Sequence, residues 1–303
     1  MTPAEFLTYL NALTVWKRGG VRAPHKPLLI LLALGRVAHK KPRLAKFSEI
    51  EKPLHCLLTE FGPRRKSNHP EYPFWYLQNS KLWEVEGAKS LKLKKNHREP
   101  KLESIRNAKG GFLLEAYELL NSNPKLVKKA VADILNLNFP ESLHADLLTE
   151  VGISSEDSGT KNSKRDPDFR NLVVRAYQHS CAVCGFDIRL GGSDLGLEAA
   201  HIWWHQAGGP DVVENGLCLC AIHHRLFDRG AFVFTNDRKL VVSEEVHGSR
   251  GLDECLFRYE GQPIKSPQRQ SYQAKEQFLE WHRTEVFKSP ARERVNHQSR
   301  ILP

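Results

Sequence analysis

The sequence has no long hydrophobic run and no internal repeat. The apolar stretch that begins at Pro27 is far shorter than the about 20 residues that a membrane-spanning helix requires. The chain opens with Met-Thr-Pro-Ala-Glu, without the basic start and apolar core of a secretory signal peptide. These absences argue against a membrane protein or a secreted one, and we expect a globular protein of the cytoplasm.

Cysteine is also sparse, with six residues in 303, which fits a reducing compartment better than a disulfide framework. Cys181 and Cys184 form a C-x-x-C pair, and Cys220 with His223 forms a C-x-x-H pair about 35 residues later. Two such pairs have the spacing of a tetrahedral zinc site, so the sequence predicts a structural Zn²⁺. The alternative is four unrelated buried residues. Cys218 is out of register and is expected to pack in the core, with a ligand role as its alternative.

Three further polar residues lie close to these pairs. Residues 197–202 are typical of a short strand that contains His201, and Asn215 lies in a loop before the second pair. His224 directly follows a predicted zinc ligand, so on a helix it points about 100° away from His223, toward a different partner. A strand, a loop and a helix therefore each supply one polar group beside the metal.

This arrangement resembles the HNH endonucleases, whose ββα-metal fold clasps one divalent ion between two strands and a helix. The likeness covers roughly residues 165–235 and includes the segment 226–232 that follows the helix. It implies hydrolysis of phosphodiester bonds in DNA, with His201 as the base that deprotonates water. It also implies that His224 binds a catalytic Mg²⁺, Mn²⁺ or similar ion. Asn215 would either bind that ion through its amide oxygen or orient the imidazole of His201.

One position departs from the pattern of that family. Many HNH proteins carry Asp or His as a metal ligand directly before the first histidine, whereas this chain has Ala200. Glu198 would leave the same face of a strand as Ala200, and His205 and Asp228 are further candidates for the missing ligand. The alternative is a zinc-containing DNA-binding protein without catalytic activity.

Charge divides the chain into two halves. Residues 1–150 hold 25 Lys and Arg against 15 Asp and Glu, whereas residues 151–303 hold 20 of each kind. The basic half fits contact with a phosphate backbone, the alternative being a lysine-rich soluble surface. Residues 151–165 are polar and rich in Ser and Gly, which is typical of a flexible linker. We therefore expect an α+β protein, with a mixed α/β DNA-reading domain over 1–150 and a nuclease domain over 166–303 whose first helix begins at Asp166-Pro167.

Two segments of the basic half combine cations with an apolar surface. His25 and Lys26 stand at the start of a helix opened by Pro27, where free backbone N–H groups and the helix dipole favour an anion. Residues 69–77 concentrate aromatic residues and prolines just after the basic run 64–66. Together these segments predict a site for a phosphate group with an unusually apolar neighbour. The alternative is that the aromatic run is ordinary core.

These segments resemble the sulfur-binding domain of phosphorothioate-dependent restriction endonucleases, in which that domain precedes a C-terminal HNH nuclease. The likeness covers roughly residues 5–110. A cavity of ring faces and aliphatic stems favours sulfur, because oxygen loses hydration there without repayment. The resemblance implies that Tyr76 lines the cavity, that Arg98 meets DNA, and that four residues surround the sulfur: His25, Lys26, Tyr72 and Pro73.

Together the two resemblances imply a restriction endonuclease that binds phosphorothioated double-stranded DNA and cuts it at a distance set by the linker. The alternative cue is a modified base such as 5-methylcytosine, or no modification at all. Cutting both strands would need a homodimer or successive nicks, and the sequence leaves both open. Lys92, Lys94, Lys95 and Arg98 form a basic run that is typical of an edge strand touching phosphates, or of a solubilising edge.

Overall fold

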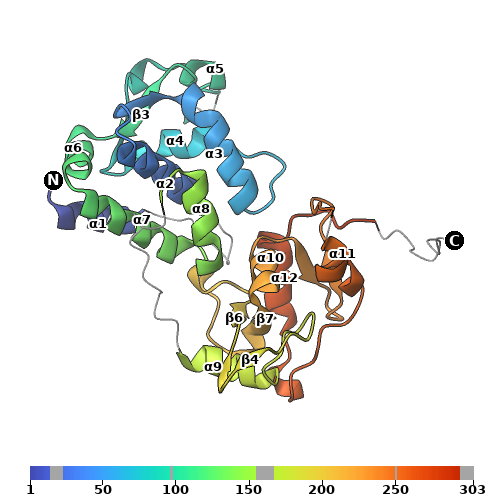
Figure 1. Ribbon diagram of the computed structural model, residues 1–303. Helices are drawn as coiled ribbons and strands as arrows, with labels where there is room; N and C mark the ends of the chain where they lie inside the picture. The colour runs from blue at the N-terminus through green and yellow to red at the C-terminus, as the bar shows by residue number, and fades with distance from the viewer. Residues whose placement is uncertain (14–22, 96–97, 155–166, 250, 294–303) are drawn as a thin grey trace. The chain divides into compact units, whose positions relative to one another are not determined.

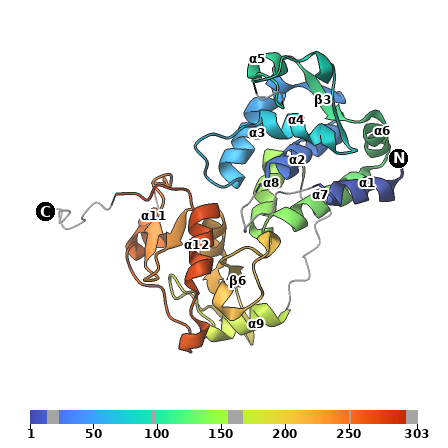
Figure 2. The same cartoon turned by 180° about the vertical axis from the view of Figure 1, so that it is seen from behind.

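The computed structural model describes residues 1–13, 23–95, 98–154, 167–249 and 251–293. The chain divides into two compact units, the first built mainly from residues before Asp166 and the second mainly from residues after it. Figures 1 and 2 show the two units from opposite sides. Most of the expected linker over 151–165, and the Asp166 expected to start the following helix, lie outside the described residues. None of the described helices is both long and apolar enough to cross a membrane.

The N-terminal unit combines helices with a small antiparallel sheet, as the predicted mixture of helix and strand requires. The sheet has the strand order β1-β3-β2, and its strands are β1 (Leu44–Lys46), β2 (Trp83–Val85) and β3 (Lys109–Phe112). The α-helices, coloured blue to green in Figure 1, are α1 (Pro3–Asn11), α2 (His25–Ala38), α3 (Phe47–Phe61), α4 (Glu71–Tyr76), α5 (Leu102–Ile105), α6 (Leu114–Ser122), α7 (Pro124–Asn138) and α8 (His144–Glu150).

The first two helices follow from local sequence signals. Helix α1 begins after Thr2, which forms a capping box with Glu5, and it ends at Asn11. Helix α2 begins at His25, two residues before the proline that was expected to open it, and its apolar residues are almost all buried. His25 and Lys26 therefore occupy the first turn of α2, whose N–H groups have no partner within a helix.

Helix α4 lies against strand β3 because β3 has a glycine at the point of contact. A Cβ atom at Gly110 would lie 2.6 Å from Cζ of Phe74, which is closer than carbon atoms can approach. Phe74 is fully buried and packs its ring against Phe47 and Trp83, with centroids 5.1 and 5.8 Å apart. This contact anchors α4 on the sheet while Tyr72, on the same helix, stays partly exposed.

The C-terminal unit is built around two antiparallel strands followed by a helix, the arrangement expected for residues 197–228. Strand β6 (Leu197–His201) pairs with β7 (Gly216–Cys220), and the register places His201 opposite Gly216. Helix α10 (Ala221–Asp228) follows β7 directly and packs on both strands. The other α-helices and strands, yellow to red in Figure 1, are α9 (Pro167–Ala176), β4 (Arg189–Leu190), β5 (Ser193–Asp194), β8 (Phe232–Phe234), β9 (Leu240–Val242), α11 (Leu252–Cys255) and α12 (Glu276–Glu285).

Candidate functional site

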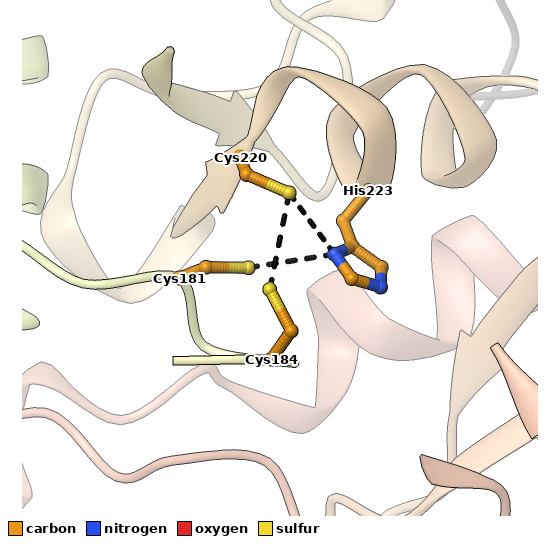
Figure 3. Close-up of side chains that lie close together, drawn as sticks. All are labelled: Cys181, Cys184, Cys220 and His223. Atoms are coloured by element: carbon orange, nitrogen blue, oxygen red, sulfur yellow. Dashed lines mark hydrogen bonds between the residues drawn. The ribbon is translucent and has the colours of Figure 1, made fainter. Parts of the chain in front are cut away.

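The four side chains of the two predicted zinc-binding pairs converge at one point (Figure 3). Cys181 and Cys184 lie in the loop after α9, Cys220 ends β7, and His223 lies in the first turn of α10. Their ligand atoms all lie within 4.8 Å of one another. The sulfurs of Cys184 and Cys220 are 4.0 Å apart, and sulfurs bound to zinc at about 2.3 Å in a tetrahedron would be roughly 3.8 Å apart. The donor set and its spacing therefore fit Zn²⁺.

The groups around this cluster favour the forms and orientations of its side chains that bind a metal. Hydrogen bonds from the other two cysteines of the cluster hold the pKa of the Cys181 thiol far below its usual range, and the thiolate is the form that binds metal. Nε2 of His223 lies 2.8 Å from the backbone carbonyl of Cys255 in α11, which fixes the ring so that Nδ1 faces the sulfurs. Cys218 lies in the hydrophobic core outside this cluster, and burial raises the pKa of its thiol to about 12.

His201, the predicted base, is held by contacts on two elements. Its ring stacks on Phe169 of α9 with centroids 4.0 Å apart and planes inclined by 17°. Its Nε2 lies 2.7 Å from Oδ1 of Asp211, and its side chain remains 16% exposed. Helix α9 can pack this close to the strands because Gly216 has no side chain. A Cβ atom at this position would lie only 2.4 Å from Val173. The imidazole is thus oriented by a carboxylate and an aromatic face, yet still accessible.

Asn215 holds the loop that follows His201. Its fully buried side chain accepts a hydrogen bond from the Trp203 N–H at 2.8 Å and donates to the carbonyls of Trp203 at 3.0 Å and Pro210 at 2.9 Å. The sequence suggested that its amide would bind the ion or orient the imidazole, but the amide is engaged with the backbone of residues 203–210. Asn215 therefore fixes the loop that connects His201 to Asp211.

His224 is buried between two carboxylates. Its Nδ1 lies 2.5 Å from Oε2 of Glu198 on β6, and its Nε2 lies 3.0 Å from Oδ2 of Asp228, one turn further along α10. Burial alone would lower the pKa of His224, but the two carboxylates outweigh it and raise the pKa to about 9. Glu198 leaves the same face of β6 as Ala200, where the family pattern has its acid. Because Glu198 and Asp228 contact opposite nitrogens of the ring, only one of them can bind the same ion as His224. Nδ1 of His224 and the Glu198 carboxylate suit a divalent ion when Asp228 accepts the proton of Nε2.

The predicted catalytic residues make their contacts in two groups. Glu198 and His201 are three residues apart on β6, so their side chains leave opposite faces of the strand. Glu198 accordingly meets His224 of α10, whereas His201 meets Phe169 of α9. His205, another candidate from the sequence, lies in a 3-10 turn, His205–Ala207, of the loop that follows β6.

Two residues of this site were missed in the sequence. Asp211 belongs to the turn Gly-Gly-Pro-Asp between the two motif residues His201 and Asn215, and an acid in that interval was the available signal. Phe169 is one of the buried apolar residues of α9, and no motif in the sequence pointed to its contact with His201. Neither contact follows from periodicity, because both depend on how a loop and a neighbouring helix pack against the end of β6.

In the N-terminal unit, the two predicted segments lie on helices that pack together, α2 and α4. Burial lowers the pKa of His25, and the nearby charges of Arg65 and His69 lower it further. The ring of His69 stacks on Tyr72, with centroids 4.6 Å apart and planes inclined by 16°. Burial also lowers the pKa of Lys26. The structure therefore brings the helix start and the aromatic segment into one neighbourhood.

The remaining residues of this neighbourhood lie on α4 and on the segment before α5. Tyr76 meets Tyr72 edge to face, with centroids 6.3 Å apart. Pro73 is buried in α4. Arg98 is exposed, and its backbone carbonyl accepts a hydrogen bond from Nε1 of Trp75 at 2.9 Å. The basic run 92–95 forms an isolated bridge to residue 100 within the described residues, in place of the edge strand that was expected.

Comparison with known proteins finds a family match in each of the two units. Residues 181–235 match the HNH endonuclease family, so the C-terminal unit carries an HNH endonuclease domain and the protein is a DNA nuclease. Residues 3–156, just over half of the chain, match the ScoMcrA-like DNA sulfur-binding domain, and the chain belongs to that family. Both resemblances found in the sequence are thus confirmed. No match was found among curated proteins.

Solved structures similar to this chain include the sulfur-binding domain of ScoMcrA complexed with phosphorothioated DNA. It is 28% identical, with 50% of this chain and 96% of that chain covered and a TM-score of 0.45. The sulfur-binding domain of SprMcrA complexed with phosphorothioated DNA is 20% identical, with coverages of 50% and 95% and a TM-score of 0.44. The type IV phosphorothioation-dependent restriction endonuclease ScoMcrA is 27% identical with a TM-score of 0.41; the match spans 49% of this chain but only 34% of that one.

Proposed function

We propose that this protein is a modification-dependent restriction endonuclease that binds phosphorothioated double-stranded DNA and hydrolyses its backbone. The observation that carries the proposal is the presence, in one chain, of a ScoMcrA-like DNA sulfur-binding domain and an HNH endonuclease domain. We assign DNA reading to residues 1–150, cutting to residues 166–303, and a tethering role to residues 151–165. Because the zinc-binding thiols must stay reduced, we place the protein in the cytoplasm.

The neighbourhood on α2 and α4 supports sulfur as the recognised atom. Tyr72 and Pro73 supply a ring face and an aliphatic surface, and sulfur is larger, softer and less hydrated than the phosphate oxygen that it replaces. The lowered pKa of His25 leaves its imidazole neutral near pH 7. An ordinary phosphate oxygen would lose its hydration in such a site, and few polar contacts would replace it. Lys26 and Arg98 would contact the DNA backbone.

His201 is the proposed general base. Asp211, at 2.7 Å, sets the orientation of the imidazole and stabilises it when it takes a proton from water. Phe169 limits rotation of the ring, and Asn215 fixes the loop that carries Asp211. These three residues keep the base in place.

His224 and Glu198 are the proposed ligands of a catalytic Mg²⁺, Mn²⁺ or similar ion, and Asp228 would accept the Nε2 proton of His224 and orient its ring. Such an ion, when bound, stabilises negative charge on the phosphorane and on the leaving oxygen. Glu198 supplies the oxygen ligand that Ala200 cannot. The cluster of Cys181, Cys184, Cys220 and His223 would hold a structural Zn²⁺, since four protein ligands leave no open position for a substrate.

A competition experiment tests this function. Equal amounts of phosphorothioated and plain duplexes of the same sequences are incubated with the full chain and Mg²⁺ or Mn²⁺, and the cleaved fraction of each is measured. We expect the phosphorothioated duplex to be cut preferentially, and His201→Ala to lose cutting while keeping its zinc. Equal cutting of both duplexes would show that the enzyme responds to another cue, and cutting by His201→Ala at the wild-type rate would remove His201 as the base.

A further inference from the structure

Lys94 and Glu99 form an ion pair that the backbone holds in place. The N–H of Lys94 donates to the carbonyl of Glu99 at 2.7 Å, and the N–H of Lys101 donates to the carbonyl of Lys92 at 2.8 Å. These bonds set the two side chains opposite each other, with Nζ of Lys94 3.3 Å from Oε2 of Glu99. The Glu99 side chain is only 17% exposed. The pair is therefore a fixed feature of this segment and not a chance contact of two long side chains.

Both members of the pair also touch the aromatic residues proposed to surround the sulfur. Nζ of Lys94 lies 4.9 Å from the ring centroid of Tyr72 and 3.5 Å from its hydroxyl oxygen. The hydroxyl of Tyr76 donates to the other oxygen of Glu99 at 2.9 Å. One carboxylate thus binds the ammonium group above Tyr72 with one oxygen and the hydroxyl of Tyr76 with the other. Glu99 determines where both of these groups stand.

The charges around Tyr72 are correspondingly reduced. Burial would lower the pKa of Lys94, but the Tyr72 hydroxyl and the Glu99 carboxylate raise it above its ordinary value, so Lys94 is a cation. Its charge is matched by the carboxylate that holds it. His25 is neutral near pH 7 because its pKa is lowered. A phosphate entering beside Tyr72 therefore meets a neutral His25 and a Lys94 whose charge is already matched.

We propose that Glu99 is a specificity-determining residue, which withholds the Lys94 ammonium group from DNA so that an oxygen placed beside Tyr72 gains no ion pair. This inference rests on the proposed function. An ordinary phosphate oxygen loses strong hydration on burial and needs a cation to compensate, whereas sulfur loses less and gains contact with the ring. By keeping Lys94 paired, Glu99 penalises oxygen more than sulfur.

The test uses the full chain in a His201→Ala background, so that DNA is bound without being cut. The probes are a duplex pool of randomised sequence around one phosphorothioate linkage and the same pool without sulfur. Glu99→Gln keeps the shape of the side chain but frees the charge of Lys94. We expect it to tighten binding of the plain pool by about tenfold, the worth of a hydrogen bond to a charged group, and to change binding of the sulfur-containing pool by less than threefold.

Two further variants assign the effect to the pair. Glu103→Gln removes an exposed acid on the neighbouring helix α5 and should leave both affinities unchanged. Adding Lys94→Met to Glu99→Gln should cancel the gain for plain DNA, because the two residues act through one interaction. If Glu99→Gln does not fold, Glu99→Asp serves instead, since its shorter side chain cannot reach both Lys94 and Tyr76 and should shift the ratio of affinities in the same direction.

The outcomes separate this inference from the function on which it rests. If the protein with Glu99 prefers the sulfur-containing pool and Glu99→Gln shows the same preference, Glu99 has no part in specificity while the proposed function stands. If the protein with Glu99 intact shows no preference for the sulfur-containing pool, the proposed function itself fails, and this inference fails with it. A loss of preference in Glu99→Gln alone supports the role of Glu99.

Discussion

Replacement of Asn215 by alanine tests whether this residue works by holding a loop. The side chain is fully buried and makes three hydrogen bonds to the backbone, at 2.8, 3.0 and 2.9 Å. A net contribution of about 1 kcal/mol for each bond gives a loss of about 3 kcal/mol in the free energy of unfolding. For a unit of this size, such a loss corresponds to a fall in Tm on the order of 10 °C.

Activity should fall as well, although Asn215 touches neither water nor DNA in the proposed site. The loop that it fixes carries Asp211, which orients His201. A displacement of the base by about 1 Å costs on the order of a hundredfold in rate, so we expect nicking by Asn215→Ala to slow by about that factor at saturating Mg²⁺. The zinc content should stay the same, because the zinc-binding cluster lies at the other end of β7.

The assay combines thermal unfolding of the full chain, followed by tryptophan fluorescence, with single-turnover nicking. Asn236→Ala is the matched control, because Asn236 is also hydrogen-bonded but exposed, and it should change stability by no more than about 0.5 kcal/mol. Unchanged Tm and nicking in Asn215→Ala would refute the argument entirely. A lower Tm with wild-type nicking would show that the loop does not position the base.

Four other changes have defined outcomes. Cys181→Ser removes one of four zinc ligands and should lower the bound zinc to well under one ion per chain, as measured by mass spectrometry; full occupancy would exclude this cluster as the zinc site. Asp211→Asn should slow nicking by about a hundredfold with little change in DNA affinity, and an unchanged rate would mean that His201 needs no carboxylate. Glu198→Gln should raise the Mg²⁺ concentration for half-maximal nicking by about 10- to 100-fold, whereas an unaltered requirement would place the ion elsewhere. A bound phosphate should raise the lowered pKa of His25, so binding takes up a proton and affinity for DNA should rise as pH falls from 7.5 to 5.5; His25→Gln should flatten this dependence, and an equal slope in both proteins would contradict it.

The zinc cluster shows what a sequence can specify by itself. Cys181, Cys184, Cys220 and His223 were predicted from spacing, because a knuckle needs two ligands separated by a tight turn and this requirement is local. A strand over 197–202 and a helix containing His224 were predicted from equally local patterns, and they are observed as Leu197–His201 and Ala221–Asp228.

The parts that could not be predicted depend on contacts between segments without a common period. Asp211 reaches His201 because a loop folds back, and Asn215 stabilises that loop through backbone atoms whose positions no sequence pattern reveals. The pairing of Lys94 with Glu99 was likewise hidden, because the basic run was interpreted as an edge that either touches phosphates or keeps the protein soluble. In each case the sequence analysis identified one side chain but not its partner, because packing determines which residues meet across a turn.

Because His201 and His224 belong to different groups of contacts, damage to each group should impair nicking in a different way. His224 is the next residue after His223, so the group of His224, Glu198 and Asp228 depends on where the zinc cluster fixes the start of α10. His201 depends instead on Asp211 and on the loop beyond β6. Loss of zinc should therefore first raise the Mg²⁺ requirement, whereas damage to the loop should lower the rate at any Mg²⁺ concentration. If loss of zinc and damage to the loop both changed only the Mg²⁺ requirement, or both changed only the rate, His201 and His224 would act as one group. The assignment of separate roles to the two faces of β6 would then be wrong.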